Sequence, residues 1–105
     1  MSSTDSQQVK AFVDNEIASN KVVLFGKTYC PFCKKAKEAL ASINANAKVV
    51  EIDQRDDCSA IQDYLGQLTG ARSVPRVFVN GKFVGGGDDT VAKVQSGEMK
   101  KLIEA

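Results

Sequence analysis

Two cysteines in the segment Cys30-Pro31-Phe32-Cys33 are the residues of this chain best placed to do chemistry. They follow the apolar stretch 21–25, which has the pattern of a buried strand, and they precede a run with helical periodicity. A C-x-x-C pair at such a junction of strand and helix is typical of thiol–disulfide redox sites. The spacing therefore predicts that these two thiols exchange disulfides.

The two thiols are expected to behave differently. Cys30 falls at the N-cap of a helix that Pro31 opens, so its sulfur should meet the free N–H groups of Phe32 and Cys33 and the positive end of the helix dipole. Lys27 adds a nearby positive charge, so we expect Cys30 to be mostly thiolate at neutral pH and to act as the catalytic nucleophile. Cys33 lies on the apolar stripe of the same helix, where burial should keep it protonated.

A structural role for these cysteines, or half of a zinc site, is the alternative interpretation. The chain has no histidine, so a mononuclear zinc site would need all three cysteines and a carboxylate, which is an uncommon set. The same absence excludes Cys–His and Ser–His–Asp catalysis. The third cysteine, Cys58, lies in a polar stretch and is interpreted as a surface thiol without an assigned role. We expect no bound metal.

Length and composition indicate one globular domain over residues 1–105. The formal net charge of +1 gives no reason to expect a nucleic acid or an anionic membrane as partner, and we expect a monomer. The polar start of the chain does not resemble a secretory signal, and the longest apolar run is too short to span a bilayer. We therefore expect a cytoplasmic protein in a reducing compartment, where a C-x-x-C pair is more often catalytic than structural.

The hydrophobic pattern predicts the elements that must position these thiols. Strands are expected over 21–25, 48–53, 76–79 and 82–84, and Asn80-Gly81 between the last two is a strong hairpin signal. Five helices are expected, and the first covers residues 6–19. The second begins at Pro31 and has an apolar stripe of Cys33, Ala36, Leu40, Ile43 and Ala47, and the third runs from about Ser59 to Gly70 with Ile61, Tyr64, Leu65 and Leu68 on one face. The fourth runs from an N-cap at Asp88 to Gly97, and a short last helix contains Met99, Leu102 and Ile103. A parallel βαβ unit followed by a hairpin predicts an α/β fold, with a four-stranded mixed sheet flanked by helices on both faces, which is the thioredoxin-like architecture.

Four segments of the chain resemble a known family in both order and spacing. They are residues 27–33 (KTYCPFC), 61–65 (IQDYL), 68–75 (LTGARSVP) and 85–89 (GGGDD). Together they resemble a dithiol glutaredoxin over nearly the whole chain. The resemblance implies glutathione as co-substrate and glutathionylated or disulfide-bonded proteins as partners. It also implies that Cys30 takes up the glutathionyl group and that Cys33 is the resolving thiol.

The resemblance further implies a groove for glutathione. Lys27 and Gln62 would bind the glycyl carboxylate, and the Val74 backbone would pair with the cysteinyl backbone like a short strand. The N–H groups that open the helix at Asp88 would hold the γ-glutamyl carboxylate, and the Asp88 side chain would hold its ammonium group. The full set that the resemblance implies is Lys27, Tyr29, Phe32, Gln62, Val74, a cis Pro75, Gly86, Gly87 and Asp88. Plainer interpretations remain open, because Lys27 and Gln62 have the character of solvated surface residues and Asp88 that of a helix cap.

The chain departs from the family pattern at two positions, and two other functions remain open. Phe32 stands where many relatives have tyrosine, and Gly87 stands where they often have cysteine or serine. One other function is a scaffold for a [2Fe–2S] cluster ligated by glutathione, against which the rigid Pro31 argues. The other is a thioredoxin-like general disulfide reductase, against which the absence of tryptophan argues.

Overall fold

The computed structural model describes residues 3–105. The elements follow in the order α1 (Ser3–Ser19), β1 (Val22–Gly26), α2 (Pro31–Ser42), β2 (Lys48–Glu51), the 3-10 turn η1 (Ile52–Gln54), α3 (Cys58–Thr69), β3 (Arg76–Val79), β4 (Lys82–Gly85), α4 (Gly87–Ser96) and α5 (Glu98–Glu104). Among these residues, no helix is long and apolar enough to cross a membrane.

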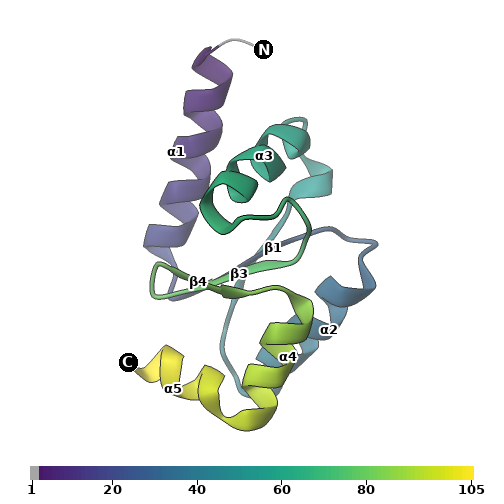
Figure 1. Cartoon of the computed structure of the whole chain (residues 1–105), viewed down its shortest axis with the longest axis vertical. Helices are drawn as coiled ribbons and strands as arrows, with labels where there is room; N and C mark the ends of the chain where they lie inside the picture. Colours follow the sequence, from purple (N-terminus) through teal and green to yellow (C-terminus); the bar gives the residue numbers. More distant parts are fainter. Residues whose placement is uncertain (1–2) are drawn as a thin grey trace.

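One four-stranded mixed sheet in the order β2-β1-β3-β4 forms the centre of the molecule (Figure 1). Strand β1 pairs in parallel with β2 and antiparallel with β3, and β3 pairs antiparallel with β4. All five residues of β1 are buried, as expected of a central strand with both faces covered. The predicted α/β architecture with a mixed sheet is confirmed.

Alternate residues of β1 face the two halves of the core. Val23 and Phe25 pack in the cluster that α1 and α3 cover. Val22 and Leu24 pack in the cluster that α2, α4 and α5 cover. Figure 1 shows this division, with α1 and α3 on one side of the sheet and the other three helices on the opposite side. The two-residue period of a strand thus determines which helices each β1 side chain supports.

The turns explain where several elements stop. Asn80 and Gly81 have φ angles of 51° and 83°, which is the pair of positive values that a type I′ hairpin needs, and the predicted hairpin is confirmed. Gly70 ends α3 with a φ of 90°, as predicted for a glycine just past a helix.

Some predicted boundaries were wrong. Helix α2 ends at Ser42, so Ile43 packs against the core from the loop that follows the helix. Strand β2 ends at Glu51, because the chain turns into η1 there. Helix α4 begins at Gly87 with Gly86 as its N-cap, so Asp88 lies inside the first turn and is not the cap.

The remaining differences concern the first strand and two helices. Strand β1 lies one residue further along the chain than predicted, and α1 begins earlier, at Ser3. Leu68 was predicted on the buried face of α3, but it is 44% exposed because it lies in the last turn, beyond the core contacts of Ile61 and Leu65.

Candidate active site

Cys30 lies at the N-cap of α2, directly after the loop that leaves the buried strand β1. Its backbone is extended (φ −92°, ψ 116°), and Pro31 occupies the first helical position, where no N–H is needed. The Cys30 sulfur accepts a hydrogen bond from the Cys33 N–H at 3.2 Å, and the Cys30 carbonyl accepts the first helical bond from Lys34. Cys30 is half-buried, and a sulfur in this position meets N–H groups that the helix itself leaves unpaired.

Cys33 lies one turn further into α2 and is fully buried. Burial, the largest cause, together with the hydrogen bond and the charge of Cys30 raises the pKa of Cys33 to about 12, against lowering by the Lys27 backbone and the Lys37 charge. The predicted contrast between an accessible first thiol and a protonated second thiol therefore agrees with this geometry. That Cys30 is ionised at neutral pH stays a prediction, which its bond from the Cys33 N–H supports.

The loop before Cys30 is anchored by a residue that sequence reasoning missed. Asp53 accepts hydrogen bonds from the Thr28 backbone N–H at 3.0 Å and from the Thr28 hydroxyl at 2.5 Å. The hydroxyl bond is the main cause that lowers the pKa of Asp53. The available signal was that Asp53 follows a strand parallel to β1, because the carboxyl ends of neighbouring parallel strands lie at the same edge of a sheet.

Two aromatic rings next to Cys30 are exposed to solvent. Tyr29 is 71% exposed and Phe32 is 52% exposed. The Lys27 Nζ lies 5.9 Å from the centre of the Tyr29 ring, and the Lys35 Nζ lies 5.8 Å from the centre of the Phe32 ring. Both ammonium groups are thus within cation–π range of the rings that border Cys30 in the chain.

The peptide bond between Val74 and Pro75 is cis, as the resemblance implies. The Val74 carbonyl oxygen lies 3.8 Å from the Cys30 sulfur, so the Cys30 thiol can donate a weak hydrogen bond to it. The fold therefore brings together Cys30 and Val74, which lie 44 positions apart in the chain.

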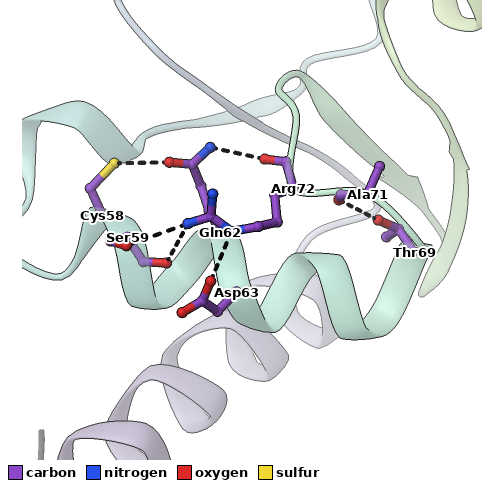
Figure 2. Close-up of polar contacts among 7 residues, drawn as sticks. All are labelled: Cys58, Ser59, Gln62, Asp63, Thr69, Ala71 and Arg72. Carbon is purple, nitrogen blue, oxygen red and sulfur yellow. Dashed lines mark hydrogen bonds and ion pairs between the residues drawn. The ribbon is translucent and has the colours of Figure 1, made fainter.

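Gln62 contacts other parts of the protein instead of standing free for a ligand. Its Nε2 donates to the Arg72 carbonyl at 2.9 Å, and its Oε1 lies 3.8 Å from the Cys58 sulfur, which is half-buried at the start of α3 (Figure 2). The Arg72 side chain returns to α3 and pairs with Asp63 at 2.8 Å. These bonds hold the loop after α3 against that helix and leave one N–H of Gln62 available for another acceptor.

The start of α4 packs directly against the start of α2. A Cβ atom at Gly87 would lie 3.0 Å from the Phe32 Cβ and 3.3 Å from the Phe32 carbonyl oxygen. A larger residue at this position would require Phe32 to move by a few tenths of an ångström, so glycine lets the two helix starts approach closely. Asp88 and Asp89 lie in the first turn of α4, where free N–H groups favour negative charge.

The predicted residues thus fall into two groups. The first turn of α2, Val74 and the first turn of α4 are in contact or in close approach through Cys30 and Phe32. Gln62 is joined to the loop that carries Val74 through its hydrogen bond to the Arg72 carbonyl. Among the described residues, no group of three or more His, Cys, Asp or Glu side chains is gathered where it could hold a metal ion.

Comparison with known proteins agrees with this arrangement. The glutaredoxin family model matches residues 22–84. The chain is 48% identical to glutaredoxin-C4 of Arabidopsis thaliana over 103 residues, which cover 98% of this chain and 76% of that protein.

Solved structures give the same result. Oxidized glutaredoxin 2 from Chlamydomonas reinhardtii is similar with a TM-score of 0.89 and 50% identity over 94% of each chain. A buckwheat glutaredoxin–glutathione complex is similar with a TM-score of 0.92 and 33% identity over 99% of this chain and 94% of that one. The chain belongs to the glutaredoxin family, a family of thiol–disulfide oxidoreductases.

Proposed function

We propose that this protein reduces glutathione mixed disulfides and protein disulfides, with Cys30 as nucleophile, Cys33 as resolving thiol and glutathione as reductant. The observation that carries the proposal is that Cys30 is only half-buried and its sulfur accepts the Cys33 N–H at 3.2 Å, while Cys33 itself is fully buried. The relative solved in complex with glutathione supports glutathione as the co-substrate.

The one-thiol route follows from the exposure of Cys30. Its thiolate attacks the glutathione sulfur of a mixed disulfide, the S–S bond breaks, and the protein thiol leaves as a thiolate with the bonding electron pair. A second glutathione, as thiolate, attacks the Cys30–glutathione disulfide. Glutathione disulfide forms and the Cys30 thiolate leaves, stabilised by the Cys33 N–H and the helix dipole.

The two-thiol route requires Cys33 to lose its proton and attack the Cys30 sulfur. The attack forms the Cys30–Cys33 disulfide and releases the group bound to Cys30 as a thiolate, and two glutathione molecules then reduce the internal disulfide. Once Cys30 is in a disulfide it is uncharged, so its charge no longer raises the pKa of Cys33, whereas burial still does. We infer that glutathione competes well with Cys33, so the one-thiol route dominates for glutathione mixed disulfides.

The remaining predicted binding residues form part of this proposal. The N–H groups of Gly86, Gly87 and Asp88 would bind the γ-glutamyl carboxylate, and the Val74 backbone would pair with the cysteinyl part of glutathione. The first turns of α2 and α4 approach each other at Gly87, and the Val74 carbonyl approaches Cys30. Both observations support one binding site formed by these three segments. Tyr29 and Phe32 would border the ligand.

The test is the reduction of a glutathione mixed disulfide, with glutathione as reductant, by matched serine variants. We expect Cys30→Ser to fall to the uncatalysed rate and Cys33→Ser to keep much of the wild-type rate. Cys58→Ser is the control and should match the wild type, because serine keeps a donor near Gln62. Full activity of Cys30→Ser would overturn the assignment of the nucleophile, and loss of activity in Cys33→Ser would overturn the one-thiol route.

A further inference from the structure

Arg76 opens β3 directly after Pro75, and its half-buried guanidinium is the centre of a network of neutral acceptors. Its Nε donates to the Pro75 carbonyl at 3.1 Å, its Nη2 to the Ser73 hydroxyl at 3.2 Å and its Nη1 to the Thr69 hydroxyl at 3.4 Å. The guanidinium carbon also lies 5.0 Å from the centre of the Phe83 ring. The side chain is thus restrained by contacts on several sides.

These contacts join the loop of Ser73 and Pro75 to the end of α3. The Thr69 hydroxyl lies 2.7 Å from the Leu65 carbonyl and 3.1 Å from the Ala71 carbonyl, and Figure 2 shows the second of these contacts. Arg76 therefore binds the loop at both Ser73 and Pro75 while it is itself held at the last turn of α3. Val74, whose carbonyl approaches the Cys30 sulfur, lies between those two attachment points.

The same guanidinium lies against the N-cap of α4. A Cβ atom at Gly86 would be 3.0 Å from the Arg76 Nη2 and 3.5 Å from the Pro75 carbonyl oxygen. Arg76 thus contacts both backbone segments of the proposed glutathione site, the one at Val74 and the one at Gly86. The side chain therefore lies beside both segments.

Arg76 forms no ion pair with the residues that the structure describes, and its hydrogen bonds go only to uncharged oxygens. Burial lowers the pKa of Arg76, and the charge of Asp89 opposes that effect. A half-buried cation bound to neutral groups gains little Coulomb stabilisation. This indicates that the planar set of guanidinium N–H donors, and not the charge alone, holds the neighbouring segments.

We propose that Arg76 is a positioning residue for the glutathione site, which holds the Ser73–Pro75 segment and the N-cap of α4 at the separation that glutathione needs. The inference rests on the proposed function and adds to it. Arg76 touches neither the reacting sulfur nor, on this view, the ligand. Its loss should therefore weaken binding through Val74 and Gly86 and leave the chemistry at Cys30 almost unchanged.

The experiment compares Arg76→Lys and Arg76→Gln with the wild type in the reduction of a glutathionylated substrate. A lysine keeps the positive charge but cannot reach three acceptors in a fixed plane. We expect both variants to raise the KM for the glutathionylated substrate about 5- to 10-fold, which is the equilibrium factor that corresponds to one net hydrogen bond. The kcat should stay within about twofold of the wild type.

Ser73→Ala removes one acceptor and should raise the KM about 2- to 5-fold. The matched control is Arg55→Gln, because Arg55 also lies over an aromatic ring, that of Phe12, and also donates to neighbouring oxygens, those of Asp57. Arg55→Gln should leave the KM unchanged. Thermal unfolding of each variant checks that the assay temperature lies below the transition.

The outcomes separate the two proposals. If Arg76→Lys keeps the wild-type KM while Arg76→Gln raises it, the positive charge alone matters, and the positioning role would be overturned. Unchanged KM in both Arg76 variants, or a loss confined to kcat, would also overturn it while leaving the proposed function intact. A wild type without turnover of the glutathione mixed disulfide would overturn both.

Discussion

Gly26 offers a direct test of the packing that holds the resolving thiol. It ends β1 and is buried, and a Cβ atom there would lie 2.9 Å from the Leu24 Cδ2, 3.1 Å from the Cys33 sulfur and 3.3 Å from the Cys33 Cβ. Its backbone conformation is open to other residues, so the effect of Gly26→Ala is steric. Leu24 and Cys33 must move to admit the methyl group.

The expected magnitude follows from two opposing effects. Inserting a methyl group into a packed core costs about 1–3 kcal/mol. Replacing glycine by alanine also restricts the unfolded chain, which stabilises the protein by about 0.4–1 kcal/mol. We therefore expect Gly26→Ala to lower the free energy of unfolding by about 1–2 kcal/mol, or Tm by roughly 4–8 °C for each kcal/mol.

Urea unfolding at constant m-value measures this change. The same substitution in a Cys33→Ala background should cost less, because the sulfur that the new methyl group meets at 3.1 Å is gone. In activity assays, displacement of Cys33 should slow the reduction of protein disulfides more than that of glutathione mixed disulfides, which need only Cys30.

An unchanged or raised free energy of unfolding in Gly26→Ala would refute this reasoning, because it would mean that the space around Cys33 adapts freely. An equal cost in the wild-type and Cys33→Ala backgrounds would show that the strain does not fall on the thiol.

Three further substitutions test single polar contacts. Thr90 is fully buried and its hydroxyl has no partner among the described residues, so Thr90→Val should raise the free energy of unfolding by about 1 kcal/mol, measured in urea; a loss would reveal an unseen partner. The bonds to Thr28 lower the pKa of Asp53 in the folded protein. They therefore stabilise the fold fully above the pKa of an unfolded aspartate, about 3.9, and this stabilisation is lost as the pH falls through the lower pKa of the folded state. The stability difference between wild type and Asp53→Asn should therefore shrink below about pH 4 in acid titrations, and a constant difference would contradict this. The Tyr64 hydroxyl donates to Asp14 at 2.6 Å, so Tyr64→Phe should cost about 0.5–1 kcal/mol at neutral pH. Burial and Asp14 raise the pKa of Tyr64 from 10.0 to about 12, so this cost should disappear across that interval, and a cost that persists above it would exclude the bond as its cause.

Features that depend on near neighbours in the chain were predictable from the sequence. The different environments of Cys30 and Cys33 follow from three positions of separation at a helix start, which sets one sulfur at the cap and the other on the buried face. The hairpin at Asn80-Gly81 and the end of α3 at Gly70 follow from the backbone angles that these residues tolerate. Apolar runs bounded by turn signals and the order of elements were enough for the mixed sheet.

The boundaries and buried faces of helices were less predictable where the local preference of a residue differed from its environment in the folded protein. Asp88 has the chemistry of a helix cap, yet α4 begins one residue before it, with Gly86 as the N-cap and Gly87 close to Phe32. Leu68 continues the apolar face of α3, but that helix extends past the core there, so the side chain is left exposed.

The sequence by itself determined the family, the reactive pair of cysteines and the arrangement of the sheet, because motifs and periodicity depend on residues that lie close together in the sequence. Only the tertiary structure decided that Asp53 anchors the loop before Cys30, that Gln62 binds the Arg72 carbonyl, and that Arg76 lies between Pro75 and Gly86. These contacts depend on how the helices and loops pack in the folded chain. A side chain's choice among distant backbone partners depends on that packing, and no local pattern encodes it.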